Sequence, residues 1–346
     1  MKIPDGRNKS IKMNLKQLEK CKVLVTPTSF SKYNRSLAKK LEDMVGEVTY
    51  NTSCKPLKEA DLLPIIKDFD GYIAGLDEIT STVIEKAENL KVIARYGIGI
   101  DKVDLDAALA KDIYVTITPG ANSVSVAELT IGFLISAARN IVFANNETRE
   151  GKWPRLKGIS LSGKNIGIIG LGNIGKEVAL RLKSFKVKIF AYDIDFDKVF
   201  AKKNSIIYLE LDNLLKNSDF VLLHIPILPS TIKIVNKEFL SKMKKGSILV
   251  NTSRGDLVDE GALYESLKSG HLRAAAIDTF CSEPDYLKCP LRSLPQLIVT
   301  PHIGAATDNA SDEMTRISIE ECIAVLSGKK PRFAVVNPQL KKKDLS

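Results

Sequence analysis

The chain of 346 residues is 44% hydrophobic and 27% charged, a balance typical of globular proteins, and its length suits about two domains with their own cores. A net charge of +10 would suit a nucleic-acid-binding protein, but the lysines are spread along helical segments with acids between them, so we expect solvated faces and no nucleic-acid partner. No secretory leader or membrane span is visible, and the five cysteines lack metal-ligand spacing, so we expect a cytoplasmic protein without membrane contact, disulfide framework or metal.

Four apolar runs in the first third of the chain alternate with segments of helical period. The runs lie at 22–28, 71–75, 91–97 and 114–118, and helical stretches such as NRSLAKKLEDMV lie between them. Apolar strands separated by single helices predict a parallel sheet that helices cover on both faces. The sequence therefore predicts a separate α/β domain in this part of the chain.

A long amphipathic segment follows at about 123–149 and predicts a helix. Ser123 or Ser125 can act as its N-cap, with Glu128 near the first turn. We expect this helix to lie between the first domain and a second one.

Three glycines with the spacing G-x-G-x-x-G, namely Gly170, Gly172 and Gly175, follow the apolar strand KNIGIIG and precede the helix KEVALRLKSF. The next apolar run, 187–193, ends in Asp193. This order is typical of dinucleotide-binding domains rather than of a turn that binds nothing. Gly170 permits the tight turn, Gly172 lets a pyrophosphate approach the backbone, and Gly175 lets helix and strand pack closely. Asp193 would bind the adenosine ribose and repel a 2′-phosphate, so the sequence predicts NAD rather than NADP.

Apolar runs and helices continue to alternate after the turn, and the last predicted helix lies at 310–330. The runs lie at 220–226, 246–253, 274–280 and 297–302. We therefore predict an α/β protein with two doubly wound domains, one flavodoxin-like and one Rossmann, and a cleft between them. The substrate domain would contain residues 1–122 and 309–346, and the NAD-binding domain residues 123–308.

Ligands of open α/β sheets bind beyond the carboxyl ends of the strands, where the second half places Arg254, Glu283 and His302. Each also has an ordinary structural interpretation, as a solvated loop arginine, a loop cap before a proline and a buried histidine. Together they fit hydride transfer, because an imidazole can exchange the hydroxyl proton while a carboxylate fixes its tautomer. The arginine fork can hold a substrate carboxylate and polarise a carbonyl. We interpret His271 as structural and give His224, beside the expected adenine pocket, no more than a minor role.

These motifs resemble those of the D-isomer-specific 2-hydroxyacid dehydrogenase family from about Lys22 to Pro338. The similar stretches are GLGNIG, LHIPILPST, ILVNTSRGDLVDEGAL, AAIDTFCSEP and TPHIGAAT. The resemblance implies an NAD-dependent dehydrogenase of small anionic 2-hydroxy and 2-keto acids, with Arg254, Glu283 and His302 as catalytic residues. It also implies further cofactor contacts along the strand ends, from Asn173, Ile174, Asp193, Ile225, Pro226, Thr231, Thr252, Ser253, Asp278 and Gly304.

The loop RYGIGID at 95–101 resembles the substrate loop of the family. The resemblance implies that amides near Ile98 and Gly99 hold the substrate carboxylate, and that Asn122 lies at the rim of the site. It also implies a homodimer built largely through the predicted helix at 123–149.

Within the family, the sequence most resembles the D-3-phosphoglycerate dehydrogenase group, because Arg95 precedes YGIG and the helix start reads PGANSVSVAELT. Arg95 would then lie near a substrate phosphate, and 3-phosphoglycerate with its 2-keto acid is the first candidate substrate. Glyoxylate, hydroxypyruvate and other 2-keto acids are the alternatives. The chain ends soon after His302, so we expect no C-terminal regulatory domain.

Two further hypotheses concern other proteins with the same fold. The formate and phosphite dehydrogenases resemble this pattern, but formate enzymes pair the histidine with glutamine, so Glu283 argues against that branch. NAD-sensing transcriptional corepressors keep the fold and can retain the three residues without turnover. An assay against 2-hydroxy and 2-keto acids separates an enzyme from such a binding protein.

Overall fold

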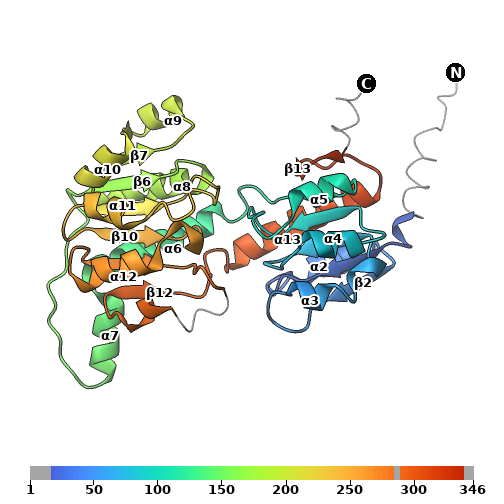
Figure 1. The fold of residues 1–346 in the computed structure, drawn as a ribbon, viewed down its shortest axis with the longest axis horizontal. Helices are drawn as coiled ribbons and strands as arrows, with labels where there is room; N and C mark the ends of the chain where they lie inside the picture. The colour runs from blue at the N-terminus through green and yellow to red at the C-terminus, as the bar shows by residue number, and fades with distance from the viewer. Residues whose placement is uncertain (1–16, 284–288, 339–346) are drawn as a thin grey trace. The chain divides into compact units, whose positions relative to one another are not determined.

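The computed structural model describes residues 17–283 and 289–338. The chain forms two compact units (Figure 1). Unit 1 contains the described residues up to Asn122 and from Ala306 onward, and unit 2 runs from Ser123 to Ala305. The sequence predicts that the chain leaves the NAD-binding domain and returns to the first domain between residues 308 and 309. The structure places this boundary between Ala305 and Ala306.

Unit 1 is built on a six-stranded sheet. Its strands are β1 (Lys22–Val25), β2 (Glu47–Tyr50), β3 (Gly71–Ala74), β4 (Val92–Arg95), β5 (Tyr114–Thr116) and β13 (Ala334–Val336). Strands β2-β1-β3-β4-β5 are parallel and have the 2-1-3-4-5 order of flavodoxin-like folds. Strand β13 adds an antiparallel edge beside β5.

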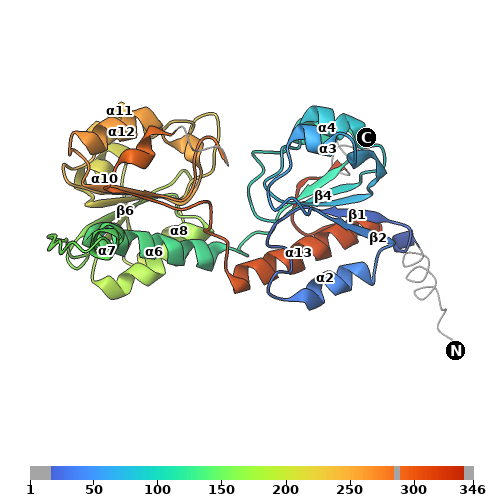
Figure 2. The ribbon, with the colours of Figure 1, turned by 90° about the horizontal axis from the view of Figure 1, so that it is seen from below.

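Helices cover both faces of the unit 1 sheet. They are α2 (Arg35–Glu42), α3 (Glu59–Leu62), α4 (Ser81–Lys86), α5 (Leu105–Ala110), α13 (Asp308–Leu326) and the 3₁₀ helix η1 (Ile66–Asp68). Figure 2 shows α2 and α13 on one face and α3 and α4 on the other. Because both faces are covered, β3 and β4 are buried along their whole length, as their continuous apolar runs predict.

Helix α13 completes one of the two cores of unit 1, although it comes from the far end of the chain. Cys322 and Leu326 of α13 lie against Gly71 of β3, where a Cβ would come within 2.8 Å of the Cys322 sulfur. The same core contains residues of β1 and α2, including Val23 and Leu41. Strand β3 therefore needs α13 to bury this face.

Unit 2 is built on a seven-stranded parallel sheet. Its strands are β6 (Asn165–Ile169), β7 (Lys188–Tyr192), β8 (Ile207–Tyr208), β9 (Phe220–Leu223), β10 (Ile248–Asn251), β11 (Ala274–Ile277) and β12 (Leu297–Val299). The order β8-β7-β6-β9-β10-β11 is the 3-2-1-4-5-6 order of Rossmann folds, and β12 extends it. The two sheets confirm the predicted fold class of two doubly wound α/β domains.

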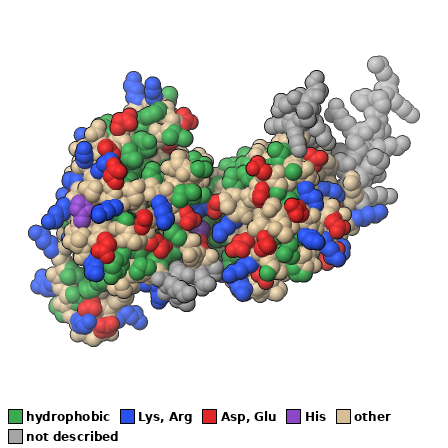
Figure 3. All heavy atoms as spheres, in the orientation of Figure 1, with side chains coloured by type: hydrophobic (Ala, Val, Ile, Leu, Met, Phe, Trp, Pro, Cys, Tyr) green, Lys and Arg blue, Asp and Glu red, His purple; other side chains and the backbone are tan. Residues whose placement is uncertain are grey.

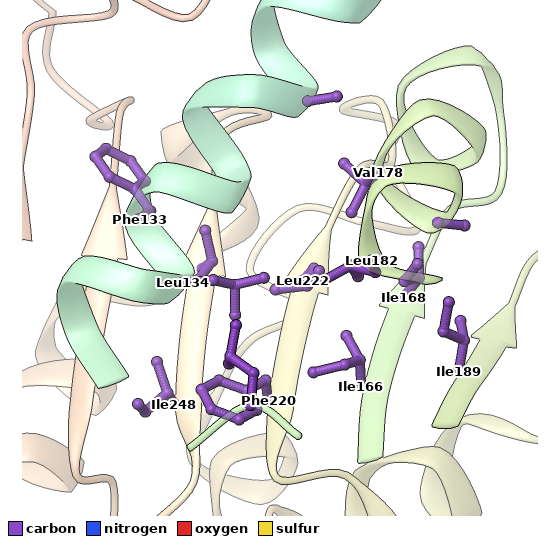
Figure 4. Close-up of a cluster of buried hydrophobic side chains, with 14 of the residues drawn as sticks. Phe133, Leu134, Ile166, Ile168, Val178, Leu182, Ile189, Phe220, Leu222 and Ile248 are labelled. Atoms are coloured by element: carbon purple, nitrogen blue, oxygen red, sulfur yellow. The ribbon is translucent and has the colours of Figure 1, made fainter. Parts of the chain in front are cut away.

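The unit 2 sheet is also covered on both faces. Its helices are α6 (Ser123–Arg139), α7 (Ile141–Arg149), α8 (Asn173–Leu182), α9 (Lys198–Lys203), α10 (Leu211–Asn217), α11 (Lys237–Lys242) and α12 (Glu260–Lys268), with the 3₁₀ helices η2 (Lys183–Phe185), η3 (Gly255–Leu257) and η5 (Pro290–Ser293). In Figure 4, Leu134 of α6 and Leu182 of α8 pack over Leu222 of β9, and all three are fully buried. Burying one such leucine contributes about 1.5–3 kcal/mol relative to its exposure.

The predicted helix at 123–149 is wrong as a single element. Asn140 has a φ of 54° and a ψ of 36°, which ends α6, and α7 continues at an angle of 64° to it. Asparagine adopts this left-handed conformation more readily than most residues. The predicted N-caps are also wrong, because α6 begins at Ser123 and the Ser125 hydroxyl donates to the Gly304 carbonyl at 2.7 Å.

No single helix of residues 17–283 and 289–338 is long and apolar enough to span a membrane. Within these ranges, α6 and α7 reach that length and composition only when taken together, as the bent pair described above. On the face that Figure 3 shows, lysine and arginine side chains alternate with aspartate and glutamate over both units. This mixed pattern is typical of solvated faces.

Candidate active site

The glycine turn joins β6 to α8 and has the geometry that its spacing predicts. Gly170 has a φ of +97°, and a Cβ there would lie 2.5 Å from the His224 carbonyl oxygen. A Cβ on Gly175 would overlap the Gly170 carbonyl oxygen. Only glycine fits these two positions, because β6, β9 and α8 approach each other there through their backbones.

Gly172, the middle glycine, is different, because the space that its Cβ would occupy is open. Apart from Gly172 and its two chain neighbours, no atom of the described residues lies within 4 Å of that position. Gly172 is also the N-cap of α8, so the free amides of the first helical turn, at Asn173 and Ile174, begin beside this space. An open approach to a helix N-terminus fits a bound phosphate group.

Asp193 follows β7 and binds directly to the glycine turn. Its Oδ2 accepts a hydrogen bond from the Leu171 amide at 2.6 Å, and its Oδ1 accepts one from the Asp195 amide at 3.1 Å. Each carboxylate oxygen can accept a further hydrogen bond. The residues around the turn therefore fit a dinucleotide whose ribose hydroxyls donate to Asp193.

The segment after β9 lies next to the glycine turn, at the carboxyl edge of the unit 2 sheet. The Ile225 side chain reaches the turn, since its Cγ2 would lie 2.9 Å from a Cβ on Gly170. The Thr231 hydroxyl donates to the Pro226 carbonyl at 2.9 Å and accepts from the Leu228 amide at 2.7 Å. Thr231 thus closes the loop that carries Pro226, a use of its hydroxyl that the sequence does not reveal.

His224 lies at the end of β9, directly against the glycine turn. Both ring nitrogens are buried and have no hydrogen-bond partner within the described ranges. Burial lowers the pKa of His224 to about 3, so the imidazole is neutral at ordinary pH.

The residues predicted to be catalytic come from three neighbouring strands, β10, β11 and β12. His302 Nδ1 lies 2.7 Å from Glu283 Oε2, and the Phe280 amide donates to Glu283 Oε1 at 2.8 Å. Both side chains are about one quarter exposed, at 26%. The pair orients the imidazole and leaves Nε2 for a substrate.

His302 itself is held by Asp278, which follows β11. Asp278 Oδ1 accepts from the Ile303 amide and Oδ2 from the Gly304 amide, both at 2.8 Å, and the Thr300 hydroxyl also donates to Oδ1. His302 has a φ of 55°, a conformation that costs a histidine free energy. Burial raises the pKa of Asp278 despite these hydrogen bonds. The Asp278 carboxylate therefore fixes the histidine loop, whereas the family resemblance implies a cofactor contact.

The Arg254 loop packs against the loop that carries Glu283. A Cβ on Gly255 would overlap the Phe280 carbonyl carbon, so the two backbones touch there. Asn251, at the end of β10, accepts from the Ser253 amide at 3.0 Å and donates to the Arg254 carbonyl at 2.8 Å. The sequence places Asn251 and Gly255 in the loop after β10 without a role for either, although an asparagine that ends a strand two residues before a loop serine is a signal for such a turn.

The other residues of this loop that were predicted to contact a ligand make hydrogen bonds to residues of unit 2. The Ser253 hydroxyl donates to the Leu223 carbonyl at 2.7 Å, and the Thr252 hydroxyl lies 3.0 Å from that of Thr130 in α6. Arg254 is half-buried, and its Nη1 donates to the Ser253 carbonyl at 2.8 Å. No group of three His, Cys, Asp or Glu side chains in the described ranges is placed to hold a metal ion.

The predicted substrate contacts Arg95, Ile98, Gly99 and Asn122 all lie in unit 1. The amides of Ile98 and Gly99 donate to no acceptor among the described residues, and Asn122 Oδ1 is buried without such a partner. Arg95 is only 2% exposed, and its guanidinium donates to the carbonyls of Ala74, Gly75 and Gly99. This inward arrangement does not fit the expectation of an arginine that reaches a substrate phosphate.

A Rossmann sheet, a glycine turn with an acidic residue beside it, and an acid-paired histidine at the same rim define a dinucleotide-dependent dehydrogenase. Comparison with known proteins agrees. The sequence profile of the NAD-binding domain of D-isomer specific 2-hydroxyacid dehydrogenases matches residues 131–304.

Similar proteins cover most of the chain. D-3-phosphoglycerate dehydrogenase of Methanocaldococcus jannaschii is 42% identical over 88% of this chain and 58% of its own length. Hydroxypyruvate reductase of Thermotoga maritima is 44% identical over 76% of this chain and 86% of its own length. Glyoxylate reductase of Thermofilum pendens is 39% identical over 87% of this chain and 91% of its own length.

Solved structures agree as well. The TT0316 protein from Thermus thermophilus has a TM-score of 0.81 at 36% identity, covering 91% of this chain and 100% of that one. D-lactate dehydrogenase from Aquifex aeolicus, complexed with NAD and lactic acid, has a TM-score of 0.81 at 26% identity, covering 91% of this chain and 99% of that one. The chain belongs to the D-isomer specific 2-hydroxyacid dehydrogenase family, whose cofactor is NAD.

Proposed function

We propose that this protein transfers hydride reversibly between NAD(H) and a small anionic D-2-hydroxy acid. The observation that carries the proposal is the 2.7 Å pair of His302 and Glu283, at the carboxyl edge of the sheet that also bears the glycine turn. When bound, NAD supplies the hydride chemistry, and its phosphates would lie at Gly172 and its ribose at Asp193.

His302 is the acid and base of the proposed reaction. During reduction, its Nε2 donates a proton to the carbonyl oxygen of the 2-keto acid, and during oxidation it takes the hydroxyl proton back. Glu283 accepts from Nδ1 throughout, which fixes the ring and stabilises the protonated form. Asp278 holds the loop on which the ring is mounted.

Arg254 and the Ile98–Gly99 amides hold the substrate in this proposal. The planar guanidinium of Arg254 suits a carboxylate and a neighbouring carbonyl oxygen, which it polarises. The two amides lack acceptors among the described residues, which supports their use as donors to a substrate carboxylate.

The first candidate substrate is the 3-phosphoglycerate and 3-phosphohydroxypyruvate pair, which the 42% identity to a D-3-phosphoglycerate dehydrogenase supports. Hydroxypyruvate and glyoxylate are the alternatives, since reductases named for them are 44% and 39% identical. The test is NADH oxidation with each 2-keto acid and NAD reduction with each D-2-hydroxy acid. A tenfold higher kcat/KM, about 1.4 kcal/mol of discrimination, identifies the preferred acid. Loss of all turnover would instead favour an NAD-binding protein of the corepressor type.

We also propose a cytoplasmic homodimer that forms through α6, α7 and the segment after them. Ile141 and Val142 of α7 are 47% and 40% exposed, and Trp153 is 83% exposed. Exposed apolar side chains such as these suit a protein interface. Sedimentation velocity of the wild type and of a Trp153→Ser variant tests the proposal, which predicts a weaker dimer for the variant.

A further inference from the structure

The loop after β4, Tyr96–Asp101, carries the two amides that are expected to bind the substrate carboxylate. Its anchor is the last residue of β4, Arg95. The Arg95 Nε donates to the Gly99 carbonyl at 2.9 Å, and Nη1 donates to the Ala74 carbonyl at 3.3 Å and to that of Gly75. One side chain therefore joins the tip of the loop to the end of the neighbouring strand, β3.

Tyr96 ties the start of the loop, since its amide donates to the Ala74 carbonyl at 2.9 Å and its hydroxyl to the Ser311 carbonyl at 3.0 Å. The Thr118 amide donates to the Gly97 carbonyl at 3.0 Å, and the Val103 amide donates to the Ile100 carbonyl at 3.0 Å. Gly97 has a φ of +136°, which permits the sharp change of direction after β4. Between these ties, the Arg95 side chain binds the Gly99 carbonyl.

The Arg95 guanidinium is also a buried cation. It is 2% exposed, and burying a charge is unfavourable unless hydrogen bonds replace those to water. The backbone carbonyls of Ala74, Gly75 and Gly99 supply such bonds, which fixes the direction of the fork. The guanidinium is thereby held beside the Gly99 carbonyl.

We propose that Arg95 is a positioning residue that holds the carboxylate-binding loop in place, and that it does not select the phosphate of a phosphorylated substrate. The proposal rests on the proposed function in one respect, namely that the ligand of this loop is the substrate carboxylate. It predicts that Arg95 contributes equally to the binding of phosphorylated and unphosphorylated 2-keto acids.

The test compares Arg95→Met, which removes the charge and the fork, with Arg95→Lys, which keeps the charge alone. Arg35→Met is the matched control, because Arg35 belongs to the same unit, is 79% exposed and makes surface contacts with Glu42 at 3.5 Å and with the Tyr50 ring. Kinetics with phosphohydroxypyruvate and hydroxypyruvate should show KM raised about tenfold for both acids in Arg95→Met, with a smaller loss of kcat. Their kcat/KM ratio should stay within about threefold of wild type.

Amide exchange gives a second measurement that does not require turnover. The Thr118 and Val103 amides should exchange faster in both Arg95 variants than in the wild type and in Arg35→Met. A selective loss of activity toward phosphohydroxypyruvate in Arg95→Met would overturn the proposal. So would an Arg95→Lys enzyme with the KM and the amide exchange rates of the wild type. If the wild type reduces neither acid, the proposed function fails, and the exchange of the two amides still decides whether Arg95 anchors the loop.

Discussion

Gly255 and Phe280 touch through their backbones, so closely that a Cβ on Gly255 would overlap the Phe280 carbonyl carbon. Gly255 follows Arg254, and the Phe280 amide donates to Glu283. The contact therefore joins the loop of the expected substrate arginine to the loop of the expected acid partner. Any side chain on Gly255 would push the two loops apart.

We expect Gly255→Ala to lower both stability and activity. Overpacking of this kind costs about 1–3 kcal/mol, measurable by urea unfolding, and the displaced Arg254 should raise KM for the 2-keto acid. Gly261→Ala in α12 is the control, because its Cβ would meet only Asp259 Oδ1, at 3.4 Å. Equal stability of the two variants would contradict this account of the loop contact.

Replacement of His302 by glutamine should abolish proton transfer without removing the cofactor site. We expect kcat to fall by about 10²–10⁴-fold, while the Kd for NADH, measured by fluorescence, changes by no more than about twofold. Glu283→Gln should cause a smaller fall, because the glutamine oxygen can still accept from Nδ1. A His302→Gln enzyme with wild-type kcat would remove His302 from the acid and base role.

Asp193→Ala should relax the preference for NAD over NADP. The variant loses the carboxylate that repels a 2′-phosphate, and it also frees the Leu171 amide of the turn. We expect the Kd for NADH to rise and the ratio of the NADPH and NADH affinities to shift by about tenfold, which is about 1.4 kcal/mol. An unchanged ratio would mean that other residues discriminate between the cofactors.

His224, whose neutral ring has both nitrogens buried, should make stability depend on pH. Its pKa is about 3 in the folded protein, whereas the unfolded chain takes up a proton near the ordinary pKa of about 6.5. The unfolded state therefore binds more protons between these values, and stability falls as the pH drops below about 6.5, by up to about 1.4 kcal/mol per unit. Urea unfolding at pH 7 and pH 5 should show a smaller loss for His224→Met than for wild type, and equal losses would refute the assignment.

The fold could be predicted well where its signals are local. The turn from Gly170 to Gly175 needs glycine at fixed spacing, because backbone atoms occupy the space of a Cβ at both ends. The buried strands show as apolar runs because both of their faces are covered. The break at Asn140 could not be predicted in this way, because the apolar pattern continues across it and one left-handed residue decides the bend.

The candidate site was harder to predict, since a residue type does not give the direction of its side chain. The sequence shows that Arg95 is a cation beside the expected substrate loop. The structure shows that its guanidinium donates to three backbone carbonyls. Asp278 likewise lies in a family motif, and its oxygens hold the Ile303 and Gly304 amides. Such roles depend on partners distant in sequence, which no local pattern reveals.

The contribution of α13 to unit 1 sets an order for synthesis on the ribosome. Gly71 and the rest of β3 emerge early, but Cys322 and Leu326, which cover them, are translated after the whole of unit 2. Unit 2 is one uninterrupted stretch and can close its own core as soon as it leaves the exit tunnel. The domain translated second is therefore the first able to finish folding, and the nascent N-terminal part has to stay soluble until then with α2 alone on the face of its sheet that α13 later shares.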